Sequence, residues 1–283
     1  MRIFEADGTA VSGEIPVNQT TALDQSNPAV TMHTDGRIFV TWDLEFADNS
    51  YDVQARYFLA DGTPDGGEFT LNTFLVDSQR TPDAAFLPDG GLATTWASLG
   101  NKDSQGFAVV ALTLNDEGDV ALDEMLVNDY EFGSQKNPVV VGLEGDKAGW
   151  FAVFWESGKQ ASGDSSGVFL ELINDFGVQV GQGIDIQVHQ NDAGMQSVPR
   201  AALLGGNDLV VVWESEDIDA DGTGISRRIF NTSGGPETSE LPVNQSVAGA
   251  QADPDVDVID QTTFVVVWTN ENTGHVMGRV LND

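Results

Sequence analysis

The chain has 283 residues, no cysteine, and 45 acidic against 12 basic side chains, which give a formal net charge of -33. The lack of thiols excludes disulfides, thiolate metal sites and a cysteine nucleophile. The negative charge opposes binding to nucleic acids and to anionic membranes, and it suits divalent cations as partners. A hydrophobic content of 40% is enough for a packed core, and no apolar run approaches the roughly 20 residues that span a bilayer.

A polar loop, VNQTTALDQSNP at residues 17–28, introduces a pattern that occurs five times with unchanged spacing. In each copy an Asn or His is followed by a Gln after six intervening residues, and by a Pro after two more. The Gln residues are Gln25, Gln79, Gln135, Gln196 and Gln251. An acid precedes each Asn or His by four residues, at Glu14, Glu68, Glu124, Asp185 and Glu240. A Trp follows each Pro, at Trp42, Trp96, Trp155, Trp213 and Trp268. Trp-to-Trp spacings of 54 to 59 residues are typical of propeller blades or solenoid turns.

The local signals within each unit all indicate β-structure. AVTMH at 29–33 and IFVTW at 38–42 flank a TDGR turn, and residues 53–72 predict a second hairpin with turn glycines. The runs WFAVFW at 150–155, LVVVW at 209–213 and TFVVVW at 263–268 are apolar without alternation, which predicts middle strands buried on both faces. Four strands in a unit of this length predict an all-β propeller of four-stranded antiparallel blades.

We predict a single five-bladed β-propeller over residues 1–283, with repeat units at approximately 1–54, 55–109, 110–169, 170–226 and 227–283. Arg2 and Arg279 occupy the same repeat position. The C-terminus therefore supplies the first three strands of a blade, and the N-terminus supplies a hairpin that would complete it. We expect N- and C-terminal strands to close the ring. Both ends contain the third strand of a blade, however, which leaves open that the natural protein has more repeats.

Units such as RYFLADGTPDGGEFTLN, DQSNPAVTMHTDGRIFVTW and VVVWESEDIDADGTGI resemble the blade-type repeats of very large secreted or cell-surface bacterial proteins. Those proteins often also carry RTX nonapeptide or cadherin-like modules. The resemblance covers essentially the whole chain, and it implies an extracellular adhesion or ligand-binding module, monomeric within a larger chain, in calcium-rich surroundings. It supplies no catalytic residues. The N-terminus has no apolar signal region, so we expect an excerpt of a longer protein or export without such a signal.

The acidic stretch DIDADGTG, residues 217–224, is the strongest metal signal. Asp217, Asp219 and Asp221 alternate and could converge on one calcium ion, with the carbonyl of Thr223 as a further ligand. The ninth and last positions of a twelve-residue calcium loop are here Ile225 and Arg228, which do not supply the usual ligands. We favour calcium over an ordinary solvated loop because of the oxygen ligands and the net charge.

Residues one and three places after each repeat Pro share one face of a strand that would line an axial channel. There Arg200 would face Asp83, Asp255 and Asp257, where it could bind an anion or a polar ligand. Pairing of Arg200 with these aspartates, which would close the channel, is at least as well supported. Trp150 lies in the insertion EGDKAGW, and we expect it to be exposed and to contact a ligand. The five repeat Trp residues are expected in the core.

The favoured function is recognition of an extracellular or cell-surface ligand, with a glycan as one candidate and calcium stabilising a loop. A hydrolase or lyase acting on polysaccharide is the alternative, and no pair among the many acids stands out as catalytic. A structural spacer is the third hypothesis. We expect the five repeat Gln side chains to bond local backbone and to hold the links between blades, because an amide can donate and accept at once.

Overall fold

The computed structural model describes residues 1–48, 50–100, 105–160, 166–180, 184–192, 194–205, 207–216, 218–219 and 221–283, and they form five antiparallel sheets. The first contains β1 (Gln25–Met32), β2 (Ile38–Glu45), β3 (Tyr51–Phe58) and β4 (Pro64–Thr70). The second contains β5 (Gln79–Phe86), β6 (Leu92–Leu99), β7 (Phe107–Leu114) and β8 (Val120–Leu126). The third contains β9 (Gln135–Gly142), β10 (Phe151–Ser157), β11 (Gly167–Ile173) and β12 (Ile186–Gln187), with the 3-10 helix η1 (Gly145–Lys147) between β9 and β10.

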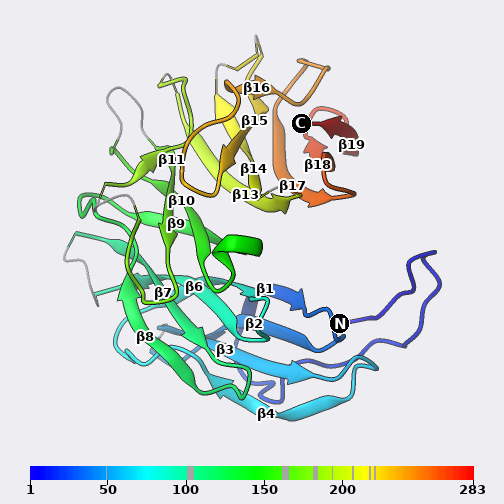
Figure 1. Cartoon of the computed structure of the whole chain (residues 1–283), viewed down its shortest axis with the longest axis vertical. Helices are drawn as coiled ribbons and strands as arrows, with labels where there is room; N and C mark the ends of the chain where they lie inside the picture. The colour runs from blue at the N-terminus through cyan, green and yellow to red at the C-terminus, as the bar shows by residue number, and fades with distance from the viewer. Residues whose placement is uncertain are drawn as a thin grey trace.

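The fourth sheet contains β13 (Gln196–Leu204), β14 (Asp208–Glu216), β15 (Thr223–Asn231) and β16 (Leu241–Pro242). The fifth contains β17 (Gln251–Val258), β18 (Thr263–Asn270) and β19 (His275–Asn282). Successive sheets stand side by side around one axis, because their first strands contact one another in the order β1, β5, β9, β13 and β17 (Figure 1). This arrangement confirms the predicted all-β propeller, and each sheet is one blade. No helix in the described ranges has the length and apolar character needed to cross a membrane.

The core lies between neighbouring blades and is centred on the middle strands. Each repeat Trp is at most 5% exposed, so the prediction that these side chains pack in the core is confirmed. One cluster, for example, joins Phe39 and Val53 of the first blade to Ala84 and Trp96 of the second. Each blade therefore buries its apolar face only by contact with the next one.

Every first strand begins with a bulge at the repeat Pro. The residue before each Pro has a positive φ between 48° and 52°, at Asn27, Thr81, Asn137, Val198 and Asp253. The pairing register with the second strand shifts at this point in all five blades. A bulge re-aims the side chains that follow it, so the residue after each Pro is directed in the same way five times.

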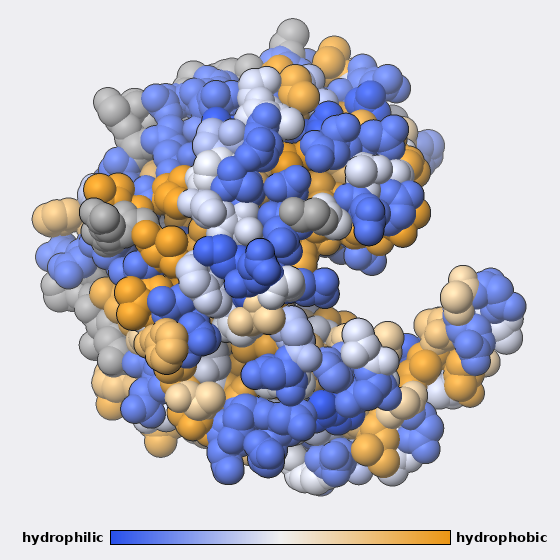
Figure 2. All heavy atoms as spheres, in the orientation of Figure 1, coloured by the Kyte–Doolittle hydropathy of each residue, from blue (hydrophilic) through white to orange (hydrophobic). Residues whose placement is uncertain are grey.

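The ring is open between the first and the fifth blade, and the predicted closure by terminal strands is not formed (Figures 1 and 2). The N-terminal segment pairs with itself through Phe4 and Ala10. Its apolar residues Met1, Ile3, Ile15 and Val17 pack on the first blade. These four residues occupy the repeat positions of Ala55, Tyr57, Phe69 and Leu71, which pack on the second blade in the same way. The N-terminal segment therefore packs on the first blade and does not pair with the fifth. The fifth blade keeps three strands.

Candidate functional site

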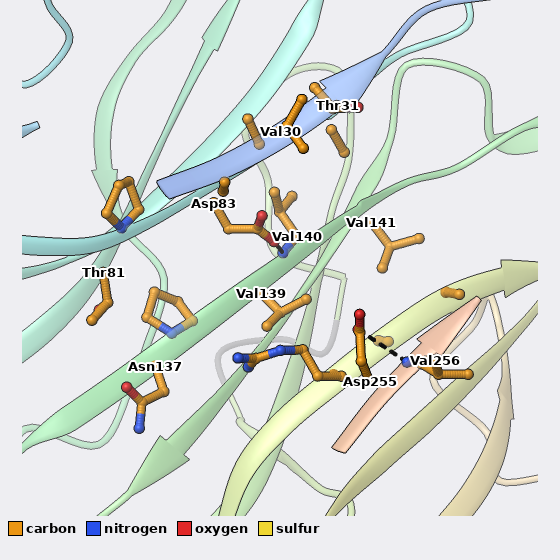
Figure 3. Close-up of a pocket in the computed structure, with 18 of the residues that line it drawn as sticks. Val30, Thr31, Thr81, Asp83, Asn137, Val139, Val140, Val141, Asp255 and Val256 are labelled. Atoms are coloured by element: carbon orange, nitrogen blue, oxygen red, sulfur yellow. Dashed lines mark hydrogen bonds between the residues drawn. The ribbon is translucent and has the colours of Figure 1, made fainter. Parts of the chain in front are cut away.

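An open channel of about 710 Å³ runs between the first strands of the five blades. Its wall includes Asp83 from β5, Arg200 from β13, and Asp255 and Asp257 from β17, so the four residues predicted to share a channel do line one (Figure 3). Valines of β9 supply the apolar part of the wall. The channel therefore combines a few convergent polar groups with apolar sides, as ligand sites commonly do.

Among the acids of the channel, Asp83 has the most strongly shifted pKa. Its carboxylate accepts a hydrogen bond of 2.9 Å from the backbone N–H of Val140 in the next blade. Burial raises the pKa of Asp83 to about 6, and the N–H bonds and the positive charge of Arg200 only partly oppose this. The negative charge of Asp255 raises the Asp83 pKa further. Asp255 and Asp257 are themselves exposed.

Arg200 does not close the channel by pairing with these acids. Its guanidinium donates to the carbonyl of Pro199 at 2.8 Å. Among the residues that the structure describes, it forms no ion pair within 4.0 Å with Asp83, Asp255 or Asp257. Arg200 is half-buried in the open channel. Its positive charge acts on Asp83 without direct contact.

A buried acid that the sequence analysis did not select contacts Asn27 and Thr81, two residues that line the channel. Asp43 follows Trp42 and is fully buried. It accepts bonds of 2.6 Å from the side chain of Asn27 and 2.9 Å from the backbone of Thr81. Burial raises its pKa to about 6. Acids also follow the Trp in the third and fourth blades, at Glu156 and Glu214, and this recurrence is the signal that could have revealed the position.

Two of the four predicted calcium ligands serve the link between the fourth and fifth blades. The Asp219 carboxylate accepts from the amide of Asn244 at 2.9 Å, and that of Asp221 accepts from the N–H of Gly249 at 3.1 Å. Thr223 starts β15 and pairs with Glu216. Asp217 lies outside the described residues. The calcium assignment at this loop therefore remains a prediction.

A different acidic group lies in the third blade. Oxygen atoms of Asp129, Glu171 and Asp185 all lie within 4.8 Å of one another, and together they could hold a metal ion. Glu171 and Asp185 are buried. Burial and the charge of Asp185 raise the pKa of Asp129. The group was missed because its members come from the third strand and two loops, and only folding brings them together.

Trp150 is half-buried, so the expectation that it is exposed is wrong. It packs against the core cluster shared by the third and fourth blades, and the ammonium of Lys147 lies 3.5 Å from its ring centre. The insertion that carries it forms η1, which is itself largely exposed, but the backbone of Trp150 is hydrogen-bonded to Leu143 and to Lys147. The structure does not place Trp150 among the residues that line the channel.

The repeated polar loops form the links between blades. The amides of Gln25, Gln79, Gln135 and Gln251 donate to carbonyls of their own loops. In the fourth and fifth blades the Gln oxygen also accepts from the indole of Trp213 or Trp268, both at 3.0 Å. These contacts agree with the local bonding expected of the repeat Gln.

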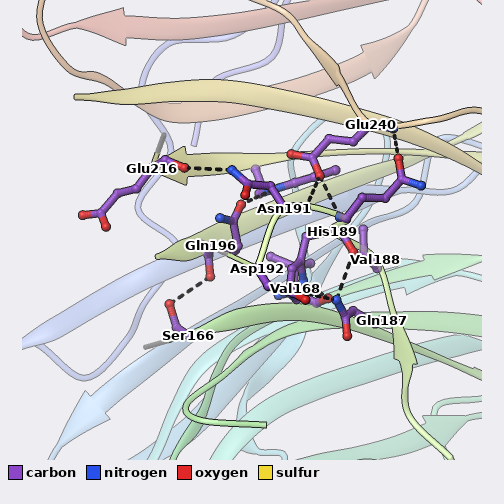
Figure 4. A network of polar contacts seen from close by, with 12 residues as sticks. Ser166, Val168, Gln187, Val188, His189, Asn191, Asp192, Gln196, Glu216 and Glu240 are labelled. Atoms are coloured by element: carbon purple, nitrogen blue, oxygen red, sulfur yellow. Dashed lines mark hydrogen bonds and ion pairs between the residues drawn. The ribbon is translucent and has the colours of Figure 1, made fainter. Parts of the chain in front are cut away.

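The repeat acid and the Asn or His complete each link (Figure 4). Glu240 accepts from the N–H groups of Gln190 and Asn191 at 2.7 and 3.0 Å, across a blade boundary. His189 replaces the repeat Asn, and its Nδ1 accepts from the N–H of Val168 at 3.1 Å. Asn244 accepts in the same way from Ile225 at 2.8 Å. The repeated polar loops therefore link the blades, whereas the polar side chains of the channel differ from blade to blade.

Comparison with known proteins supports the fold. No protein-family model and no curated protein sequence matches the chain. Among solved structures, an α-L-arabinofuranosidase from Lactobacillus brevis is similar with a TM-score of 0.52 and 12% identity, over 90% of each chain. A thermostable family-43 glycoside hydrolase has a TM-score of 0.49 and 10% identity, over 94% of this chain and 91% of the other. A glycosyl hydrolase from Bacteroides ovatus has a TM-score of 0.46 and 11% identity, over 99% and 88%.

The likeness to the arabinofuranosidase supports a β-propeller. At such low identity the likenesses show the fold alone, because one fold serves many functions. They do not support the RTX or cadherin-like adhesin part of the resemblance seen in the repeats.

Proposed function

We propose that the protein hydrolyses glycosidic bonds in its axial channel. The observation that carries this proposal is the pair of unequal carboxylates there: Asp83 is set in the wall with a pKa of about 6, and Asp255 is exposed. Acid and base roles in glycoside hydrolysis fall to two carboxyl groups whose environments differ in this way. The glycoside hydrolase names of similar propellers make a glycan the first substrate class to test.

In the proposed reaction, protonated Asp83 donates its proton to the glycosidic oxygen as the bond from that oxygen to the sugar carbon breaks. Ionised Asp255 takes a proton from the water that attacks the same carbon, so the products are a reducing sugar and an alcohol. Arg200 would orient a hydroxyl or carboxylate of the substrate through its planar guanidinium.

Substitution of Asp83 tests this proposal. Asp83→Asn keeps an oxygen that can accept from Val140 but cannot supply the proton, so kcat on a cleaved glycan should fall about 100-fold or more. Because the acid must be protonated, activity of the parent should decline as the pH rises through about 6. Reducing-end release measures both effects, with exposed Glu117→Gln as the control. Undiminished kcat in a folded Asp83→Asn protein would refute the catalytic role.

Glycan recognition without cleavage is the second candidate. It is favoured by the bond from Val140, which holds the Asp83 carboxylate as a rigid acceptor between two blades. Calorimetric binding of a glycan that is never cleaved would support this function over hydrolysis. The resemblance of the repeats to secreted bacterial proteins leads us to propose an extracellular setting for either function.

We also propose that calcium binds between Asp129, Glu171 and Asp185. Three hard oxygen donors suit calcium, and Glu171 stands where three other blades have Arg56, Arg228 or Arg279. Calcium should raise the melting temperature of the parent but raise that of Glu171→Gln much less. Asp219→Ala tests the other predicted site in parallel. Equal calcium responses in the parent and Glu171→Gln would exclude the cluster.

A further inference from the structure

A second cavity, of about 370 Å³, opens beside the mouth of the channel. Its wall includes Arg80, Phe107 and Lys136, and it shares Asn27, Thr81 and Asn137 with the channel. Figure 3 shows Thr81 and Asn137 at the same end of the channel. None of the described residues that line this mouth pocket is acidic, in a chain with a net charge of -33.

The two cations of the mouth pocket come from one repeat position. Arg80 and Lys136 each directly follow a repeat Gln, where the other three blades have Ser26, Ser197 and Ala252. Their blades are neighbours, since β5 contacts β9. The positive charge is therefore confined to one boundary of the propeller, which marks this pocket as different from its structural equivalents.

Arg80 is held in place from two sides. Its guanidinium carbon lies 4.0 Å from the ring centre of Tyr51, and its Nε lies 3.6 Å from the carboxylate of Asp43. Asp43 is in turn fixed by Asn27 and Thr81. Within the described part of the chain the two terminal nitrogens of Arg80 make no hydrogen bond or ion pair. A guanidinium braced in this way is pre-organised to bind an oxyanion through its free edge.

The other polar groups of the pocket are also available to a ligand. Lys136 is exposed and forms no ion pair or hydrogen bond with any described residue. The hydroxyl of Thr81 is buried and has no hydrogen-bond partner among the described residues. A buried polar group without a partner is unfavourable. Thr81 also has a φ of 51°, which is unfavourable for a β-branched residue. A bound oxygen ligand would satisfy the hydroxyl and the cations together.

We propose that the mouth pocket binds an anionic substituent, a carboxylate or a sulfate ester, on the glycan that occupies the channel. This inference rests on the proposed function in taking the ligand to be a glycan. It adds a substrate class, because the surrounding negative charge repels acidic polymers except where Arg80 and Lys136 receive them. A neutral sugar would gain nothing from two adjacent cations.

The experiment compares three oligosaccharides of equal length by calorimetry in 0.15 M salt: an oligogalacturonate, a sulfated galactose oligomer and a neutral xylose oligomer. The parent should bind one of the two anionic probes at least about tenfold more tightly than the neutral one. Lys136→Gln should weaken that binding about tenfold, the loss of one charge-assisted hydrogen bond, and should leave neutral binding unchanged. Lys136→Arg should keep the affinity for the anionic probe close to that of the parent.

Lys147→Gln is the matched control, since it removes one positive charge from the insertion that follows the far end of β9. Equal losses in Lys136→Gln and Lys147→Gln would overturn the inference, as would equal affinity of the parent for all three probes. Failure of the catalytic proposal gives a different result. In that case no glycan is cleaved, but the anionic probe still binds and its binding still depends on Lys136, which supports the pocket. Cleavage of neutral glycans that needs Asp83 but is indifferent to Lys136 would overturn the pocket alone.

Discussion

At the residue scale, a single side-chain type performs the same task in four of the five blades, where the repeat Gln donates to carbonyls of its own loop. The buried Gln135 donates to the carbonyls of Tyr130 and Phe132 at 3.0 and 3.4 Å. These carbonyls belong to a loop that has no strand partner, and a buried carbonyl left unpaired is costly. Invariant spacing was enough to predict this local bonding. The bonds from Trp213 and Trp268 to the same Gln position were not foreseen, because they join side chains 17 residues apart on paired strands.

Gln135→Leu tests the link. The substitution keeps the side-chain volume but removes the donor to the Phe132 carbonyl and one of the two donors to the Tyr130 carbonyl, so it should destabilise the fold by about 1–3 kcal/mol. For a protein of this size that corresponds to a melting temperature lowered by roughly 2–6 °C. Gln245→Leu, at an exposed loop position, is the control. A melting temperature equal to that of the parent would count against the role of the repeat Gln.

At the element scale, strand type and order follow from local patterns, whereas strand irregularity does not. The unbroken apolar runs predicted middle strands buried on both faces, and β10 and β14 are buried almost throughout. The bulge before each Pro was not predicted, since a residue preceding proline normally adopts an extended conformation. It exists because the first strand must pair with the second while its loop is held by Gln. The sheets also begin at the Gln position, so the predicted unit boundaries fall inside the third strand of each blade.

The N-terminal segment shows how one element can take the place of a missing blade. It packs on the first blade as the outer half of a preceding blade would, with Ile3 and Ile15 against the cluster around Trp42. The N-terminal segment and β19 both correspond to the third strand of a blade, so they cannot both fill that position in one closing blade. The three-stranded fifth blade is the direct consequence.

At the scale of the whole molecule, the two faces that border the opening are apolar and uncovered. Val30 is 65% exposed, whereas three of its four equivalents, Ala84, Val140 and Val256, are at most 8% exposed. On the other side Val276 is 77% exposed, although the four equivalent residues of the other blades, Val53, Val109, Val168 and Ile225, are fully buried. Positions that pack together at every other boundary thus face each other across the opening, so burial of apolar surface favours closure.

We expect the ring to close in solution by approach of the fifth blade to β1. Phe39 and Ala84 share a core cluster between the first two blades, and their equivalents at the opening are Val265 and Val30. In the variant Val30→Cys/Val265→Cys, a short bifunctional thiol reagent should therefore link the two positions within one chain. The native chain has no cysteine to interfere. Val30→Cys/Val120→Cys is the control for non-specific linkage, and equal yields in the two variants would argue for a ring that stays open.

The sequence was enough to predict the number of blades, their strands, the buried Trp positions and the linking loops, because these depend on spacing within a single repeat. It also placed Arg200, Asp83, Asp255 and Asp257 in one channel, since a common repeat position implies a common place around the axis. Only folding reveals that Val140 holds Asp83, that Asp129 meets Glu171, and that Tyr51 and Asp43 brace Arg80. These residues lie up to about 57 positions apart, and their meeting depends on how whole sheets pack, which no local pattern encodes.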